Sequence, residues 1–293
     1  MTLPDFLVIG AAKAGTTALY WYLAEHPAVF MSRIKETNFF AYGVDEAGRL
    51  LYGDPQMHHF PVTTRAAYEQ LFASAAGASA VGEVSPIYLE CPQAAERIRA
   101  GLADPRLIVS LRDPVDRAYS DYLMDLRHRG RRLDPGRDLS PDAPWVQPNS
   151  HWMRIGRYHE QLARYYERFD RSRIHVFLFD DLKQDATATV QAVYRFLGVA
   201  DDFVPDFDAP HGVGGMPANM LLEGLVKRTA ALRSAVEPYM PKRAANWARR
   251  VRTRNMRQSP PLPPELRQRL TDVFREDILK TSQLIGRSLD HWL

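Results

Sequence analysis

The segment Asp5-Phe-Leu-Val-Ile-Gly10-Ala-Ala-Lys13-Ala-Gly15-Thr16-Thr17, close to the N-terminus, decides the fold. Its first half is a short, continuous apolar run that stops at a glycine, which is typical of a buried parallel strand. From about Thr16 the apolar residues recur at helical spacing until His26-Pro27 ends the pattern. The segment therefore predicts a strand, a loop and a helix in direct succession.

The loop between that strand and helix has the composition of an anion-binding site. Glycines let the backbone approach a ligand closely, and the free N–H groups of a helix N-terminus attract an anion. The loop nearly matches the phosphate-loop pattern G-x-x-x-x-G-K-[ST], but Thr16 stands where the lysine belongs, and the lysine comes earlier, at Lys13. This displacement argues against an ATPase, whose lysine follows the second glycine. A capped strand-to-helix turn without a ligand is the alternative.

The rest of the chain alternates predicted strands with predicted helices. Apolar runs indicate strands over 80–84, 106–111 and 173–179, and periodic apolar residues indicate helices over 93–100, 114–127, 157–169, 186–197 and, as a long amphipathic helix, 264–293. Such alternation implies a parallel sheet with helical crossovers. We expect an α/β fold, with a P-loop NTPase-like parallel sheet flanked by helices, in a single domain over 1–293 with helical and loop insertions.

Three segments are set apart by their composition. Segments 130–150 and 204–217 are rich in Gly, Pro or Asp and are predicted to be flexible loops. Segment 242–264 is first basic and then rich in proline, and it connects to the C-terminal helix. Its part 242–257 carries seven Lys or Arg and no acid, so it can face a carrier protein or another anionic partner. A solvated basic helix is the alternative.

A second anion-binding pattern spans 107–122, where a predicted strand runs into a helix. Asp113 can cap that helix. Ser120 lies seven residues beyond Asp113, two turns along, and so falls on the same helix face. Arg112 and Ser120 can therefore converge on one anion, with the guanidinium supplying paired donors. An ordinary ion pair of Arg112 with Asp113 or Asp116 is the alternative.

Composition argues against several classes of protein. The net charge is only +3, from 38 basic and 35 acidic side chains, so the chain is not a polycation of the kind that binds nucleic acid. No apolar run approaches the roughly 18 residues of a membrane span, and no secretory signal is visible. The single cysteine, Cys91, cannot form an internal disulfide and lacks metal-ligand spacing around it. We expect a cytoplasmic protein with no metal.

Together the two motifs resemble the signature of sulfotransferases that use 3′-phosphoadenosine-5′-phosphosulfate (PAPS). In that family the first motif binds the 5′-phosphosulfate and the second binds the 3′-phosphate. The matching residues here are Lys13, Ala14, Gly15, Thr16 and Thr17, then Arg112 and Ser120. The segment Lys35-Glu36-Thr-Asn-Phe39-Phe40 resembles the Glu-x-x-Phe-Phe segment of the heparan-sulfate-type branch and its bacterial relatives, which implies that Glu36 is the catalytic base.

The resemblance implies an enzyme that takes a sulfuryl group from PAPS, releases adenosine 3′,5′-bisphosphate (PAP) and needs no metal. Lys13 would stabilise the leaving phosphate, and Glu36 would take a proton from an attacking hydroxyl, in preference to an amine. Glycosaminoglycan-modifying relatives have a lysine where this chain has Val84, which argues against a polyanionic sugar acceptor. A natural product or other small molecule, a lipid, a sugar or a carrier-bound chain all fit. The late cofactor-covering loop of the family matches Gly214 and Gly215.

Aromatic residues near Glu36 and the loops are the predicted acceptor contacts, because their side chains form rigid walls and Tyr and Trp add a polar group. The candidates, each of which also suits the core, are Phe39, Phe40, Tyr88, Trp152 and Tyr158. Two other functions fit the sequence. A P-loop kinase using ATP and Mg²⁺ is disfavoured by the displaced lysine, and a nucleotide-binding protein without turnover is disfavoured by the presence of Lys13 and Glu36.

Overall fold

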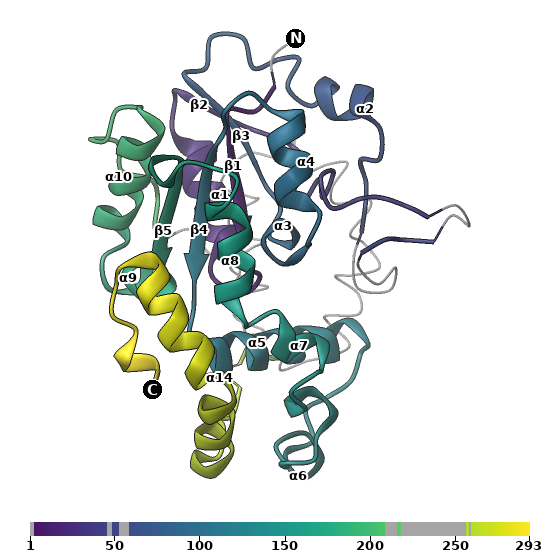
Figure 1. The fold of residues 1–293 in the computed structure, drawn as a ribbon. Coiled ribbons are helices and arrows are strands. Elements are labelled where there is room, and N and C mark those ends of the chain that lie inside the picture. The colour runs from purple at the N-terminus through teal and green to yellow at the C-terminus, as the bar shows by residue number, and fades with distance from the viewer. Residues whose placement is uncertain (1–2, 46–48, 53–58, 209–215, 218–255, 258) are drawn as a thin grey trace.

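A five-stranded sheet forms the centre of the computed structural model, which describes residues 3–45, 49–52, 59–208, 216–217, 256–257 and 259–293. All pairings in it are parallel. Its strands lie in the order β2 (Val29–Met31), β3 (Ala80–Val84), β1 (Phe6–Gly10), β4 (Arg106–Leu111) and β5 (Ile174–Leu178) (Figure 1). The predicted α/β fold with a parallel sheet is confirmed.

Helices connect the strands and continue beyond them. They are α1 (Thr16–Glu25), α2 (Arg65–Gln70), α3 (Ile87–Glu90), α4 (Ala94–Gly101), α5 (Pro114–His128), α6 (Pro135–Asp138), α7 (His151–Arg154), α8 (Tyr158–Tyr166), α9 (Phe179–Gln184), α10 (Ala186–Leu197) and α14 (Pro264–Ile285). The 3-10 turns are η1 (Pro144–Val146), η2 (Arg171–Arg173) and η4 (Asp290–Trp292), and a short antiparallel pair joins β6 (Met216–Pro217) to β7 (Met256–Arg257). None of the helices in the described residues has the length and apolar character of a membrane span.

Both faces of the sheet are buried, which is why its strands are continuous apolar runs. Successive residues of a strand point to opposite faces. Leu7 and Ile9 of β1 pack in the hydrophobic cluster that includes residues of α5, α8 and α14. Phe6 and Val8 pack in the cluster that includes residues of α1 and α10. Figure 1 shows α1 and α10 on one side of the sheet and α3, α4 and α8 on the other.

The strand predictions hold at β3 and β4, while the end of β5 differs from the prediction. The predicted strand 173–179 is shorter, because Arg173 belongs to η2 and Phe179 opens α9. The Asp181 carboxylate accepts the backbone N–H of Leu178 at 2.9 Å, which starts the helix there. The three-residue β2 and the six-residue α9 were not predicted. The C-terminal helix ends at Ile285, before the predicted 293, because Gly286 turns left-handed at φ 66°.

Segment 130–150 contains more structure than its composition predicts. It holds α6 and η1, and Trp145 within it is fully buried. The Trp145 ring stacks on Tyr122 of α5 at 5.3 Å, and its Nε1–H donates to the Asp138 carbonyl at 2.7 Å. Flexibility of this segment stays a prediction. Most of the other two segments lies outside the described residues, namely 209–215 and 242–255.

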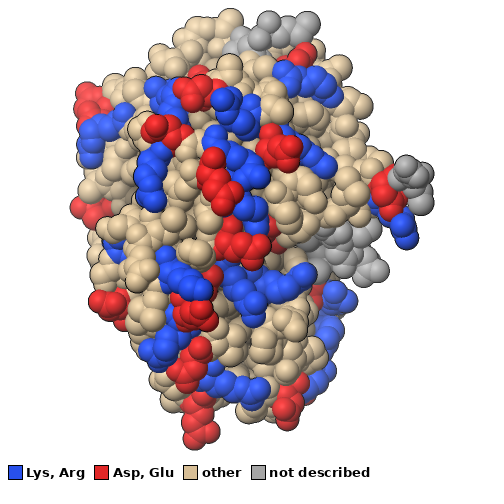
Figure 2. Space-filling model, in the orientation of Figure 1, with Lys and Arg blue, Asp and Glu red and all other residues tan. Residues whose placement is uncertain are grey.

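Charges of both signs alternate on the face of the molecule that carries α8. Figure 2 shows Lys and Arg interspersed with Asp and Glu there, with no field of one sign. Arg164 of α8 lies 3.3 Å from Glu160, and Arg168 lies 3.1 Å from Glu167. On this face, positive charge is therefore largely neutralised by neighbouring carboxylates.

The parallel sheet collects the segments that follow its strands at one edge. The carboxyl ends of parallel strands lie together at one edge of the sheet. That edge therefore holds the loop after β1, the segment after β2, the start of α3, Arg112 after β4 and Phe179 after β5. In α/β sheets of this kind, ligands bind at this edge. The functional site is therefore expected there.

Gly82 of β3 lies where a side chain cannot fit. A methyl group added at Gly82 would lie 2.3–2.5 Å from three ring atoms of Phe6, which is fully buried. Such overpacking costs about 1–3 kcal/mol. We expect Gly82→Ala to lower the free energy of unfolding in urea by about that amount. Gly136→Ala, whose added methyl would lie 3.6 Å from the Asp134 side chain, is the control and is expected to stay within about 0.5 kcal/mol. Equal stability of the two variants would contradict this packing.

Candidate active site

The loop between β1 and α1 leaves a helix N-terminus open to an anion. Gly15, at φ 84°, is the cap residue of α1, and no side chain caps the helix there. The first turn of α1 contains no acidic residue, so its free N–H groups and partial positive charge are not met by a local carboxylate. A methyl group at Gly15 would lie 2.8 Å from the Phe179 ring. This position therefore requires glycine for both its conformation and its space.

Lys13 is a partly buried cation in a strained position of the same loop. Its backbone lies in the left-handed region at φ 68°, which costs a non-glycine residue about 1–2 kcal/mol. Its Nζ contacts the Met124 sulfur of α5 at 3.2 Å, and no carboxylate of the described residues lies within ion-pair distance of it. Burial lowers the pKa of Lys13 to about 8; Asp121 raises that pKa, and nearby arginines lower it. Retention of a strained, buried lysine indicates a role for its charge.

Arg112 completes the loop from the neighbouring strand. Its Nη1 donates to the Lys13 carbonyl at 3.1 Å, and the Tyr158 hydroxyl donates to the Arg112 carbonyl at 2.9 Å. The guanidinium lies over the Phe179 ring, with Cζ 5.1 Å from the centroid. Its Nε is buried and has no hydrogen-bond partner among the described residues. A buried cation with an orphaned donor fits an anionic ligand.

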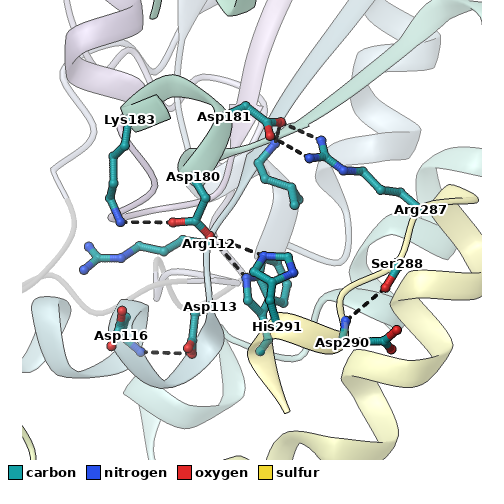
Figure 3. Close-up of polar contacts among 12 residues, drawn as sticks. Arg112, Asp113, Asp116, Asp180, Asp181, Lys183, Arg287, Ser288, Asp290 and His291 are labelled. Atoms are coloured by element: carbon teal, nitrogen blue, oxygen red, sulfur yellow. Dashed lines mark hydrogen bonds and ion pairs between the residues drawn. The ribbon is translucent and has the colours of Figure 1, made fainter. Parts of the chain in front are cut away.

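The alternative role for Arg112 was an ordinary ion pair with Asp113 or Asp116. The described residues contain no such pair. The Asp113 carboxylate instead caps α5, accepting from the backbone N–H of Val115 at 2.8 Å, and contacts Arg267 of α14 at 3.1 Å. Asp116 also contacts Arg267. Figure 3 shows Asp113 and Asp116 together beside Arg112. Both carboxylates are therefore engaged elsewhere.

Ser120 reaches the same region from α5. It lies one turn before Met124, and residues four apart on a helix share a face. Because the Met124 sulfur contacts Lys13, the Ser120 side of α5 faces the loop after β1. The structure thus brings Lys13 and Arg112 together, and the part played by Ser120 stays a prediction. Gly214 and Gly215 lie outside the described residues.

These residues fit a nucleotide with two separate phosphate groups. The N-terminus of α1 has Thr16 and Thr17 in its first turn and no side-chain cap. The guanidinium of Arg112 donates to the Lys13 carbonyl in the loop before α1, while its Nε has no partner among the described residues. Two partly buried cations that have no carboxylate partner among the described residues favour negative charge from a ligand, which would offset their desolvation. The donor set contains amides, hydroxyls and cations, which suits phosphate oxygens.

Glu36 lies in the segment after β2 and is partly exposed. Its Oε1 contacts the Lys35 Nζ at 3.2 Å, so the simple ion pair with its neighbour is present. About 37% of the Glu36 side chain is exposed, which leaves the carboxylate open to an incoming acceptor. The adjacent Thr37, in contrast, is fully buried. Glu36 therefore stands on an anchored segment while its own side chain reaches solvent.

Glu83 of β3 is the anchor for that segment. Its carboxylate is fully buried and accepts four hydroxyl hydrogen bonds, from Thr37, Ser85, Tyr68 and Tyr88, at 2.7–2.9 Å. Burial raises the pKa of Glu83, and the four hydroxyls oppose that rise. The backbone N–H of Asn38 then donates to the Ser85 hydroxyl at 3.0 Å. One buried carboxylate thus fixes the backbone that follows Glu36.

The predicted acceptor contacts lie in two settings. Phe40, Tyr88 and Tyr158 are buried in the core, and the two tyrosine hydroxyls are engaged with Glu83 and Arg112. Phe39 and Trp152 are half-buried; Phe39 stacks on Tyr68 at 4.3 Å, and the Trp152 Nε1 is buried without a partner in the described residues. Contact of any of these five with an acceptor stays a prediction.

Two residues at this edge were not identified from the sequence. Phe179 was taken as the last residue of a strand, yet it packs against Gly15 and Arg112. Its place directly after a parallel strand was the available signal. Glu90 of α3 is buried and accepts the Tyr52 hydroxyl at 2.8 Å, and burial raises the pKa of its carboxyl to about 7. Nothing in the local sequence pattern marks Glu90.

Comparison with known proteins identifies the family. The model of the sulfotransferase family matches residues 4–203. The membrane-associated sulfotransferase kil1 of Dictyostelium discoideum is 31% identical over 144 residues, covering 48% of this chain and 27% of that protein. The bifunctional heparan sulfate N-deacetylase/N-sulfotransferase 4 of Mus musculus is 26% identical over 314 aligned positions, covering 99% of this chain and 31% of that protein. The chain thus spans less than a third of the length of these two relatives.

A solved structure matches over the whole length. The sulfotransferase from Alicyclobacillus acidocaldarius superimposes with a TM-score of 0.70 and 28% identity, covering 100% of this chain and 99% of that one. The chain described here belongs to the sulfotransferase family.

Proposed function

We propose that this chain transfers a sulfuryl group from PAPS to a hydroxyl, in preference to an amine, of a small-molecule, lipid, sugar or carrier-bound acceptor. PAPS as donor and PAP as product follow from the family. The finer assignment is ours, namely that Glu36 is the general base, that Lys13 stabilises the leaving phosphate, and that the 3′-phosphate binds at Arg112 and Ser120.

The order of the strands is the observation that carries this proposal. β1 lies between β3 and β4, so its phosphate-binding loop separates two groups of residues. The segment with Glu36 comes from the β2–β3 side, and Arg112 comes from the β4–β5 side. A donor whose 5′-phosphosulfate lies on the central loop would direct its 3′-phosphate to Arg112. Its sulfuryl group would then be available to an acceptor on the Glu36 side.

Each proposed role follows from the chemistry of its residue. PAPS supplies a sulfuryl group on a phosphate leaving group, so the protein has to align the reactants and stabilise negative charge. Lys13 would hold its ammonium against the departing phosphate oxygen. Thr16, Thr17 and the N–H groups of α1 would hold the 5′-phosphate. Glu36 would accept the proton of the acceptor, a role worth about 10²–10⁴-fold in rate.

The surroundings of Glu36 favour an acceptor that is not strongly anionic. Val84, which replaces the lysine of glycosaminoglycan-modifying relatives, is buried. The carboxyl groups of Glu83 and Glu90 lie on β3 and α3 of the same side. A polyanionic sugar would find no cation at Val84 and two carboxyl groups nearby. We also propose that residues 242–257 recognise a carrier protein. The reaction would need no metal and would take place in the cytoplasm.

The donor assignment is tested by calorimetric titration. We expect the wild-type chain to bind PAP without metal and more tightly than ATP with Mg²⁺, because Arg112 and Ser120 favour a 3′-phosphate. Tighter binding of ATP with Mg²⁺ would point to a kinase instead.

The catalytic assignments are tested by two variants with matched controls. With labelled PAPS and a metabolite pool, we expect Lys13→Ala to lower turnover by about 10²–10³-fold and Glu36→Gln by about 10²–10⁴-fold. The control variants Lys280→Ala and Glu160→Gln alter exposed side chains and are expected to remain active. Circular dichroism should show intact folds for all four. Turnover of Glu36→Gln at the wild-type rate would remove Glu36 from the role of base.

The pH dependence of PAP binding tests the charge of Lys13. Because the pKa of Lys13 is about 8, its ammonium is charged below pH 8 and becomes neutral above it. We expect PAP affinity to fall by up to about tenfold between pH 7 and pH 9, since about a tenth of the ammonium remains one unit above its pKa. The phosphates, with a second pKa of about 6, are already largely ionised at pH 7, and their further ionisation toward pH 9 does not weaken binding to a cation. Lys13→Arg keeps its charge and is expected to give a flat profile; a parallel decline in both proteins would contradict this role.

The Glu83 network is tested by separating turnover from nucleotide binding. In Glu83→Gln, the amide cannot accept all of the hydroxyl hydrogen bonds that the carboxylate accepts. We expect the unsatisfied hydroxyl groups to lower the free energy of unfolding by about 1–3 kcal/mol. We expect turnover to fall, because the backbone after Glu36 loses its anchor, while the dissociation constant of PAP stays within about twofold. Glu160→Gln, which alters an exposed side chain of α8, is the control. A loss of PAP affinity equal to the loss of turnover would show that Glu83 supports the whole sheet edge instead.

A further inference from the structure

Two cations converge on the ring of Phe179 beside the phosphate-binding loop. The Arg112 Cζ lies 5.1 Å from the ring centroid, and the Lys183 Nζ lies 4.6 Å from the same centroid. The two groups are therefore less than 10 Å apart. The Phe179 ring also contacts the position where a Gly15 side chain would stand. Figure 3 shows Lys183 running down from α9 toward the guanidinium of Arg112, which extends from the end of β4.

The two cations differ in what neutralises them. Among the described residues, Arg112 has no carboxylate within ion-pair distance, and its Nε lacks a partner. Lys183 lies 3.0 Å from Asp180, one turn earlier on α9, and about half of its side chain is exposed. An exposed pair of this kind contributes about 0–1 kcal/mol. Lys183 can therefore leave Asp180 at little cost when a stronger anion arrives.

Asp180 keeps α9 in place whether or not Lys183 is bound to it. Its carboxylate also accepts the Nε1–H of Trp292 at 3.3 Å and lies 3.6 Å from the Nε2 of His291. The next residue, Asp181, binds both guanidinium nitrogens of Arg287 at 2.5 and 2.6 Å. Figure 3 shows these contacts between α9 and the C-terminal segment. Phe179 and Lys183 are thus presented from a fixed helix.

The charge of a 3′-phosphate calls for more than one cation. A phosphate monoester carries about −1.5 to −2 charges at pH 7, whereas Arg112 supplies a single positive charge. Ser120 adds a hydroxyl donor without charge. Lys183 is the cation of the described residues that shares the Phe179 ring with Arg112. Its flexible stem and three donors suit a phosphate oxygen.

We propose that Lys183 leaves Asp180 and binds the 3′-phosphate of the donor nucleotide together with Arg112. This inference rests on the proposed function, which places that phosphate at Arg112 and Ser120. Lys183 then contributes to the choice of a 3′-phosphorylated nucleotide over one that carries only a 5′-phosphate.

The test compares two nucleotides that differ in the 3′-phosphate alone. Dissociation constants are measured by calorimetry for PAP and for adenosine 5′-monophosphate, and the preference is their ratio. We expect Lys183→Gln to reduce this preference by about five- to tenfold, through weaker binding of PAP. Lys183→Arg keeps the charge and is expected to retain the preference within about threefold. Lys280→Gln removes an exposed lysine that pairs with Glu276 on α14, and is expected to leave the preference unchanged.

The outcomes separate this inference from the proposed function. If wild-type protein shows no preference for PAP, the assignment of a 3′-phosphate site fails, and the role of Lys183 fails with it. If the wild-type preference is present and Lys183→Gln keeps it, the role of Lys183 alone is overturned. Equal weakening of both nucleotides by Lys183→Gln would also overturn it, because a contact to the 3′-phosphate cannot affect a nucleotide that lacks one.

Discussion

The site depends on positive charge that is buried beside a helix N-terminus and left without a carboxylate in the described part of the chain. Lys13 and Arg112 are held within one hydrogen bond of each other through the Lys13 carbonyl, and burial lowers the pKa of the lysine. Removing two cations from water is costly unless an anion joins them. The fold therefore maintains an excess of positive charge at the end of β1, which is the property that our proposal assigns to binding of the donor phosphates.

The buried carboxyl group of Glu83, in contrast, has its hydrogen-bond partners within the protein. It is a buried charge-bearing group as well, but both of its oxygens accept hydroxyl hydrogen bonds from within the protein. A buried group that is fully satisfied stiffens its surroundings, whereas one with free donors attracts a ligand. The two sides of β1 thus have different tasks. The β3 side provides a rigid support for the segment that carries Glu36, and the β4 side carries Arg112, whose Nε has no partner among the described residues.

Local patterns predicted the parts of the site that depend on short segments. The glycine loop, the cap at Asp113 and the runs of β3 and β4 follow from neighbouring residues, so their positions were visible in the sequence. Phe179 was misplaced because an apolar run gives no sign of where a strand ends and a helix begins. The deciding cap is a local hydrogen bond from the Leu178 N–H to Asp181, whose carboxylate is also held by the distant Arg287. The hydroxyl groups that donate to Glu83 come from residues 37, 68, 85 and 88. These residues meet at one carboxylate only in the folded chain, so the network could not be predicted from the sequence. Tyr88 and Tyr158 were treated as possible pocket walls, although their hydroxyls serve internal hydrogen bonds.

The tie between Arg287 and Asp181 has a consequence for biosynthesis. These residues are 106 positions apart, and Arg267 reaches Asp113 across 154 positions. Contacts of such long sequence separation form late, because a long loop must close before they stabilise anything. A chain still emerging from the ribosome has the glycine loop early but lacks the braces that fix α5 and α9 around it. The contacts that hold α5 and α9 therefore form only after the segment with Arg267 and Arg287 has been synthesised and has docked.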